Sequence, residues 1–137
     1  MFRVTLSRCA LALAAILTPS FVSEVNASDQ EVLASSFGWN VEDSTEALQK
    51  AIDSGAKRVV VDKQSGPWIV RPIVLRGDLE LVLQEGVEIL AKKGEYKKLG
   101  DVMFRASCVS NLTIRGEGNG ASLRMRKKDF TAQHEYA

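Results

Sequence analysis

The sequence predicts an all-β fold in which short strands coil into a solenoid behind one capping α-helix. Residues 43–54 have a helical pattern, because their apolar side chains recur on one face: Ala47, Leu48, Ala51 and Ile52. Five short apolar runs follow without a second helical pattern: VVV from residue 59, WIV from 68, IVL from 73, LELVL from 79 and VEIL from 87. Turn residues such as Ser65-Gly66-Pro67 separate these runs. This order indicates a helix that covers one end of a coiling sheet.

Residues that commonly start and stop helices mark both ends of the helical segment. Asp43 is expected as the N-cap, and Glu46, three residues later, can complete a capping box. Gly55 follows the segment and can adopt the positive φ that ends a helix. We therefore expect a short amphipathic helix whose apolar face covers the first coil.

The strand pattern repeats with a long offset. Residues 79–83 correspond to residues 112–115, and Leu79 and Leu112 are 33 positions apart. A compact solenoid repeat takes roughly 20–29 residues. The excess coincides with AKKGEYKKLGD at residues 91–101, which we interpret as a polar loop inserted between coils. Insertions of this kind gather on one face of a solenoid, often the binding face.

Apolar and charged residues alternate within the predicted strands, as in LEL from residue 79 and LRMR from residue 123. Neighbouring side chains of a strand point to opposite faces, so the apolar ones are expected inside and the charged ones outside. Each strand then has one side that faces the core and one side that faces solvent. A long polymer can lie on such a surface.

The helical segment and the apolar runs that follow it resemble the opening of right-handed parallel β-helix proteins of the pectate lyase and polygalacturonase type. The resemblance extends over residues 39–125. That opening commonly has aspartates with Ser or Thr, a short helix with Leu or Ile and a Gln, a β run, and a Gly-containing turn with an aromatic residue. The chain agrees with it at Asp43, Ser44, Ala47, Leu48, Gln49, Ala51, Ile52, Gly66 and Trp68. It departs at Glu42, where many members have a second aspartate.

The resemblance implies a right-handed parallel β-helix, of which this chain holds the N-terminal coils. It implies no particular reaction, because the family includes lyases, hydrolases, epimerases and non-catalytic modules. Its lyases can bind calcium through clustered aspartates and its hydrolases use aspartates of central coils, whereas Asp62, Asp78 and Asp101 stand singly here. No catalytic residue is therefore assigned, and no cofactor is expected.

The first 27 residues resemble a secretory signal. Arg3 and Arg8 precede an apolar run at residues 9–17, which is too short to span a bilayer. Small residues at Val25-Asn26-Ala27 predict cleavage after Ala27. We expect a secreted or periplasmic protein without stable membrane association, with a lipoprotein or a retained N-terminal anchor as alternatives.

Two segments follow the signal: a leader at residues 28–41, and residues 42–137 with the cap helix and the first coils. A coil of a β-helix cannot bury its own ends, so the architecture needs several coils and a cap at each end. The closing sequence DFTAQHEYA contains no recognisable cap. We therefore expect the chain to be the first part of a longer protein.

Net charge argues against nucleic acid as a partner. Removal of Arg3, Arg8 and Glu24 with the signal, from totals of 18 basic and 17 acidic residues, leaves 16 of each. The distribution is uneven, because residues 91–128 hold 10 basic and 3 acidic side chains. A local basic zone is expected in an otherwise neutral protein.

The basic zone supplies the candidate glycan-binding residues: Lys92, Lys93, Tyr96, Lys97 and Lys98. The lysines can hold carboxylates or sulfates of an anionic polysaccharide, and the Tyr96 ring can stack on a sugar. A second basic cluster occupies residues 124–128. The alternative is that these charged side chains bind no ligand and occupy a loop and the outer face of a strand only because these positions face solvent.

Three other features receive structural interpretations. Cys108 is unpaired once Cys9 leaves with the signal, and we expect it to be buried. His134 is the only histidine, which argues against a metal site or a Ser/His/Asp triad. The glycines at residues 116–120 precede a predicted strand instead of a helix, so we expect a turn and not a phosphate site.

Two functions agree best with these observations. The first is the N-terminal part of an exported β-helix protein that binds or degrades polysaccharide, with lyase or hydrolase activity in later coils. The second is a non-catalytic β-helix module for adhesion or structural display. A small exported protein that is complete at 137 residues is the third interpretation.

Overall fold

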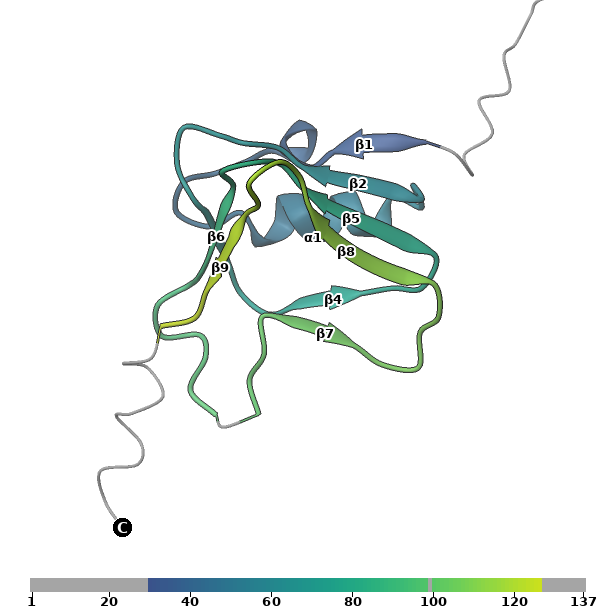
Figure 1. Cartoon of the computed structure of the whole chain (residues 1–137). Helices are drawn as coiled ribbons and strands as arrows, with labels where there is room; N and C mark the ends of the chain where they lie inside the picture. The colour runs from purple at the N-terminus through teal and green to yellow at the C-terminus, as the bar shows by residue number, and fades with distance from the viewer. Residues whose placement is uncertain (1–29, 99, 127–137) are drawn as a thin grey trace, which may run out of the picture.

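A computed structural model describes residues 30–98 and 100–126 of the chain. These residues form one α-helix, one 3₁₀ helix and nine short strands, and every strand pairing among them is parallel (Figure 1). The chain is therefore rich in parallel β structure with a single α-helix in this part, as the sequence predicts. The predicted signal at residues 1–27 and the closing DFTAQHEYA lie outside the described residues.

The strands assemble into three sheets. Sheet A contains, in order, β1 (Glu31–Leu33), β2 (Arg58–Val61), β5 (Leu79–Leu83) and β8 (Leu112–Gly116). Sheet B contains β3 (Trp68–Val70), β6 (Glu88–Ala91) and β9 (Ser122–Arg124), and sheet C contains β4 (Ile73–Leu75) and β7 (Phe104–Ala106). From β2 onward the chain visits sheets A, B and C in turn. One full round therefore adds one strand to each of the three sheets.

The strand register explains the long repeat. Val59 of β2 pairs with Leu81 of β5, and Leu79 of β5 pairs with Leu112 of β8, so the second step along the chain is half as long again as the first. The second pairing confirms the predicted correspondence. Only Arg71 and Pro72 connect β3 with β4, whereas positions 92–103 connect β6 with β7. The extra length therefore lies in this connection, and the stacking of sheets A and B continues past it.

Apolar side chains of the three sheets meet in one core. Alternation points every second side chain inward, and inward residues such as Val59, Leu81 and Ile89 are closed to solvent. Trp68 is also fully buried, and its indole Nε1 donates to the Asp62 carbonyl at 2.9 Å. Complete burial of a large aliphatic or aromatic side chain stabilises the fold by about 1.5–3 kcal/mol. Stacked rows of such residues hold the sheets together.

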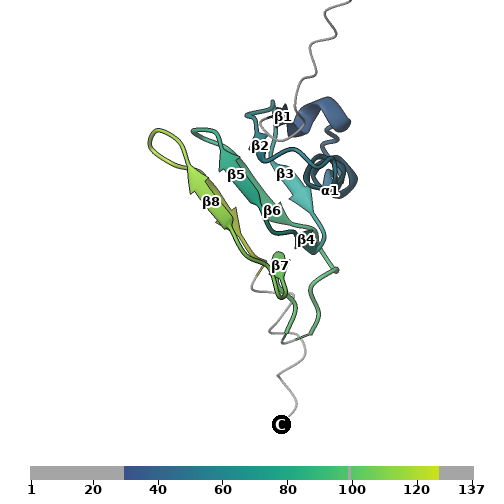
Figure 2. The ribbon, with the colours of Figure 1, turned by 90° about the vertical axis from the view of Figure 1, so that its right-hand side faces the viewer.

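Helix α1 (Thr45–Asp53) lies within the predicted segment and buries the predicted apolar face against the 3₁₀ helix η3 (Ala34–Phe37), β2 and β4. Gly55 has a φ of 89°, a conformation that strains other residues, and it follows the helix as predicted. Figure 2 shows α1 and β8 at opposite ends of the strand stack. The helix thus covers the N-terminal end.

The start of α1 differs from the predicted capping box. Ser44, and not Asp43, occupies the N-cap position, and its side chain makes no capping hydrogen bond. Asp43 accepts hydrogen bonds from the backbone N–H and the hydroxyl of Thr45. Glu46 pairs with Lys50 at 3.4 Å instead of reaching back to the cap. The predicted capping box is therefore wrong. The Asp43 carboxylate also binds Arg71 and Lys92 of distant segments, and local spacing does not reveal such contacts.

A glutamine side chain takes the place of a strand at the free edge of β4. Nε2 of Gln49 donates to the Val74 carbonyl at 3.0 Å, and Oε1 of Gln49 accepts from the Val74 N–H at 3.0 Å. The hydroxyl of Thr45 accepts from the Arg71 N–H at 2.8 Å in a similar way. Polar contacts therefore join the helix to β4 and to the residue after β3, in addition to its buried apolar face.

The other end of the stack is open among the described residues. β7, β8 and β9 are the last strands of their sheets. Ile114 and Leu123 are in register with Leu81 and Ile89, which are fully buried, yet Ile114 is 42% and Leu123 is 49% exposed. The predicted inward position of Leu123 has the correct register but brings little burial, because no further layer of described residues covers it.

Cys108 is exposed, and the predicted burial is therefore wrong. The residue has a φ of 53° in the connection between β7 and β8. The apolar character of residues 104–109 predicts a core position. This segment contains only the short strand β7 and a turn at the surface. Exposure leaves the thiol accessible to solvent.

Candidate functional site

The candidate glycan-binding residues lie in the connection at residues 92–103, which we name the basic loop. Backbone hydrogen bonds hold its two ends: the Lys92 N–H donates to the Val70 carbonyl at 2.9 Å, and the Ile73 N–H donates to the Met103 carbonyl at 2.8 Å. Met103 is buried. Between these ends the loop projects away from the three sheets (Figure 1). The stack therefore fixes where the loop begins and ends.

Tyr96 anchors the basic loop and does not present its ring to solvent. The residue is 1% exposed, and its hydroxyl donates to the Val70 carbonyl at 2.9 Å. Burial, with the nearby charges of Asp101 and Glu95, raises the pKa of Tyr96 to about 12. The prediction that this ring stacks on a sugar is wrong, because the ring is enclosed by the core.

Lys92 is held in a cluster of charges with Asp43 and Arg71. Its Nζ lies 2.6 Å from Oδ2 of Asp43, and Nε of Arg71 lies 3.1 Å from the same oxygen. Burial by itself raises the pKa of Asp43, but the hydrogen bonds from Lys92 and Thr45 and the charge of Arg71 hold this pKa well below its usual range. Lys92 therefore joins the basic loop to the start of α1, and its charge is largely satisfied within the protein.

Lys93, Lys97 and Lys98 are exposed, and their ammonium groups form no ion pair among the described residues. The backbone N–H groups of Lys97 and Lys98 both donate to Oδ2 of Asp101 at 2.8 Å. Asp101 thus shapes the turn that presents these two lysines. Of the five candidate residues, these three lysines are available to a ligand in solution.

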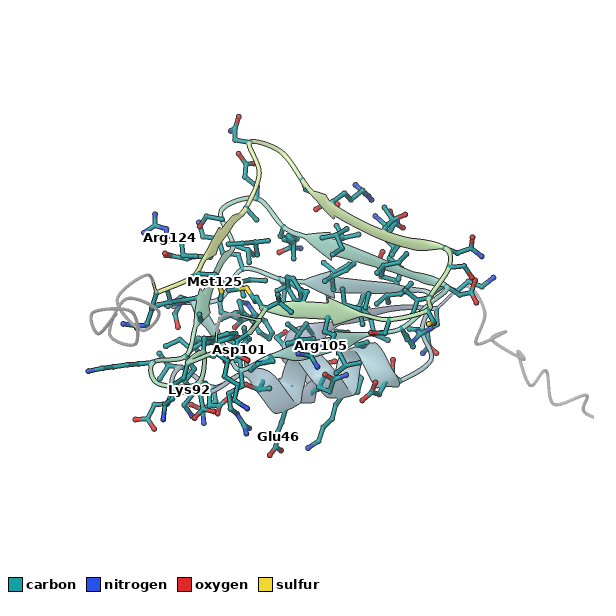
Figure 3. All side chains as sticks on the ribbon, turned by 90° about the horizontal axis from the view of Figure 1, so that it is seen from below. Glu46, Lys92, Asp101, Arg105, Arg124 and Met125 are labelled. Carbon is teal, nitrogen blue, oxygen red and sulfur yellow. The ribbon has the colours of Figure 1, made fainter. Side chains whose placement is uncertain are left out.

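A polar pocket of about 390 Å³ adjoins the Asp43 cluster on the side of α1. Its walls include Phe37, Asn40, Glu46, Lys50 and Arg71. Figure 3, seen from below, shows Lys92, Asp101 and Glu46 on the face formed by the basic loop and α1. Acidic and basic groups line the pocket in equal number, so it has no strong preference for the charge of a ligand.

A ladder of alternating charges crosses the outer face of sheet A. Arg58 lies 3.0 Å from Glu31 and 3.7 Å from Glu80, and Nε of Arg115 lies 2.6 Å from Glu80. The hydrogen bond from Arg115 lowers the pKa of Glu80, and the charge of Arg58 lowers it further. Sequence reasoning missed this ladder, although outward positions on strands that pair in the predicted register could have indicated it.

An open groove of about 480 Å³ runs beside this ladder, and residues of β2, β5 and β8 and of the segments just before these strands line it. Two of its residues, Asp78 and Asn111, precede paired strands and have φ values of 53° and 56°. Nδ2 of Asn111 donates to Oδ1 of Asp78 at 2.8 Å. This contact links equivalent turns of successive rounds, so its polar groups stabilise the stack.

The described residues contain no group of three or more His, Cys, Asp or Glu side chains arranged to hold a metal ion. In the same part of the chain, no helix combines the length and apolar character that crossing a membrane requires. Comparison of the chain with models of protein families, with curated proteins and with solved structures finds no match.

Proposed function

We propose that this chain is the N-terminal part of an exported protein with a right-handed parallel β-helix that binds polysaccharide. The observation that carries the proposal is the recurrence of the three sheets, since consecutive strands return to sheets A, B and C in the same order. The steps from Val59 to Leu81 and from Leu79 to Leu112 agree with solenoid turns that differ in one inserted loop.

The residues that carry the resemblance to this family support the proposal through their contacts. Leu48 and Ile52 are fully buried under the end of the stack, and Gln49 binds the free edge of β4. Trp68 fills the core behind the turn at Gly66. Each of them therefore has a physical reason to be present at the start of a parallel β-helix.

Binding of an anionic polysaccharide is the activity that we assign to the exposed part of the basic loop. Lys93, Lys97 and Lys98 bring three positive charges to one connection that projects from the stack. Exposed ammonium groups attract uronate or sulfate groups at long range, and salt screens this attraction. The salt dependence of binding is therefore the readout that distinguishes this site from apolar adsorption.

The test replaces Lys93, Lys97 and Lys98 with Gln and compares affinity for polygalacturonate with that of the unchanged protein. A matched control replaces the exposed residues Lys50, Lys57 and Lys63, which lie outside the basic loop. We expect binding that weakens with salt, a clear loss in the loop variant and little change in the control. Equal binding to a neutral polymer, or equal losses in both variants, would contradict the proposal.

Lyase or hydrolase activity is proposed to belong to other coils of a β-helix, and a non-catalytic display module is the second candidate. The ion pairs of Asp43 and Glu80 favour this second candidate for the described part. Asp43 and Glu80 have lowered pKa values and bind cations of the protein, so neither can easily deliver a proton at neutral pH. Release of reducing or unsaturated sugars from pectate by the purified chain would argue against a non-catalytic display module.

Export is proposed from the signal-like residues 1–27, and it has its own test. Cells expressing the full chain should release a protein whose new N-terminus is Ser28, as measured by mass spectrometry of the secreted or periplasmic fraction. Recovery of only unprocessed protein that begins at Met1 in the membrane fraction would contradict this part of the proposal. The result does not depend on glycan binding.

A further inference from the structure

The polar pocket beside η3 and α1 has the size of a small-molecule site. Its volume of about 390 Å³ is within the range of roughly 300–1,000 Å³ that such sites occupy. Figure 2 shows α1 and β8 at opposite ends of the strand stack, so strands that stack on β8 would not cover the pocket. The pocket therefore belongs to the capped end of the molecule.

Part of the pocket wall is apolar. Phe37 is half-buried, because it packs against the core and also lines the pocket. Gly38 and Ala47 add no polar side chain to the wall. An aromatic ring in a pocket wall offers a flat surface to the C–H groups of a ligand and stabilises the complex through their burial.

Three side chains around the pocket have unused hydrogen-bond donors. Nε of Arg71 lies 3.1 Å from Asp43, and neither Nη group of Arg71 donates a hydrogen bond within the described part of the chain. Oδ1 of Asn40 accepts from a backbone N–H at 2.8 Å, whereas its Nδ2 has no acceptor among the same residues. Nζ of Lys50 contacts only Glu46 there, at 3.4 Å.

Glu46 is the acceptor that remains available. The Asp43 carboxylate is already occupied, because Oδ1 accepts two hydrogen bonds from Thr45 and Oδ2 binds two cations. The Glu46 side chain is 77% exposed, and its only ion pair among the described residues is the one with Lys50. The pocket thus combines several donors, one carboxylate acceptor and an apolar wall.

The hydroxyl groups of a neutral sugar match this combination. Each hydroxyl can donate one hydrogen bond and accept others, and a sugar ring also has an apolar C–H face. An ion of either sign is not favoured, because two acidic and two basic side chains line the pocket. An apolar ligand would separate the donors of Arg71 and Asn40 from water without replacing its hydrogen bonds.

We propose that this pocket binds one neutral sugar residue, with the C–H face of the sugar against Phe37. The sugar hydroxyls accept from Arg71 and Asn40 and donate to Glu46. Asp43 is a positioning residue, because its carboxylate holds the Arg71 guanidinium at the pocket. This inference concerns a second site outside the basic loop, and it does not rest on the binding of an anionic polysaccharide.

The first test titrates the methyl glycosides of glucose, galactose and mannose into isotope-labelled protein, purified from cells that express the full chain. We expect at least one of them to bind with a dissociation constant on the order of 1 mM, as is usual for a ligand of this size. Amide NMR signals of residues 37–50 and of Arg71 should shift, and those of the exposed basic loop should not. Salt should have little effect, because these ligands have no charge.

The second test compares variants. Glu46→Ala should weaken binding at least about tenfold, because it removes the acceptor for the sugar hydroxyls. Glu42→Ala is the matched control, since Glu42 is also exposed but does not line the pocket. The variant with Gln at positions 93, 97 and 98 should bind the neutral sugar as the unchanged protein does, which separates this site from the basic loop.

Four outcomes would overturn the proposal. The first is that none of the three glycosides binds. The second is tighter, salt-dependent binding of the methyl glycoside of galacturonic acid, which differs from that of galactose only at C6, because it would identify a site for anions. The third is a preference for free glycine, which would identify a site for zwitterions. The fourth is equal loss of binding in the Glu46 and Glu42 variants. None of these outcomes bears on the basic loop.

Discussion

At the scale of single residues, Asp43 connects three segments that are distant in sequence. Its carboxylate binds Thr45 at the start of α1, Arg71 after β3 and Lys92 at the start of the basic loop. Lys92 is 49 residues away from Asp43 along the chain. One side chain thus fixes the helix, the segment after β3 and the basic loop relative to one another.

Replacing Asp43 with Asn should lower the free energy of unfolding by about 1–3 kcal/mol at neutral pH, because it removes charge-assisted hydrogen bonds. The folded pKa of Asp43 is depressed, so its contribution is present above the unfolded value of about 3.9 and is lost as pH falls toward the folded value. Urea denaturation should therefore show a difference between the two proteins that begins to shrink below about pH 4.

Glu42→Gln is the matched control for this experiment. Glu42 is exposed, and a surface substitution of this kind changes stability by about 0.5 kcal/mol or less. A difference between wild type and the Asp43 variant that stays constant down to strongly acidic pH would show that the carboxylate charge does not contribute.

At the scale of elements, α1 acts as a cap through both an apolar face and the Gln49 amide. The amide has a donor and an acceptor in the same arrangement as a peptide group, so it can pair with Val74 as a strand would. A helix that ends a sheet in this way prevents another strand from adding to β4.

Leu48→Ala should lower the free energy of unfolding by about 2–5 kcal/mol, because Leu48 is fully buried and its truncation leaves a cavity. Gln49→Ala should cost about 1–2 kcal/mol, since its two hydrogen bonds end at the exposed Val74. Lys50→Ala, on the outer face of the helix, is the control. Thermal or chemical unfolding measures all three, and a Leu48 variant as stable as the control would mean that α1 is not a cap.

At the scale of the whole molecule, order should decrease from the capped end of the stack to the open end. β5 pairs on both sides, with β2 and with β8, whereas β8 pairs on one side among the described residues. Hydrogen exchange at low protein concentration should be slowest in β2 and β5 and fastest in β8 and β9. Uniform protection of all four strands would contradict this gradient.

Local patterns predicted the features of the fold that depend on neighbouring residues. The apolar face of α1 and the stop at Gly55 follow from periodicity and a turn residue close in sequence, and the pairing of Leu79 with Leu112 follows from a repeated strand pattern. A resemblance to one family supplied the expectation of a parallel arrangement. These signals are strong because a helix or strand buries its apolar face wherever it packs.

Contacts between distant segments limited the prediction of the candidate site. The neighbouring lysines predict that Tyr96 lies at the surface, but its ring is buried and its hydroxyl donates to the carbonyl of Val70, 26 residues earlier. The sequence likewise places Lys92 among the ligand-binding lysines, but Asp43 binds its ammonium group. Spacing along a loop does not show which of its side chains turn back to the core.

The basic loop indicates where a chain of this fold can gain residues during evolution. The step from β5 to β8 keeps the strand register although the chain takes a longer path there than from β2 to β5. Length at the corner between sheets B and C is therefore tolerated, provided that an anchor such as Tyr96 closes the base of the added segment. New specificity can arise there by insertion and drift, without any substitution in the strands. The same corner is a suitable place to graft a foreign peptide.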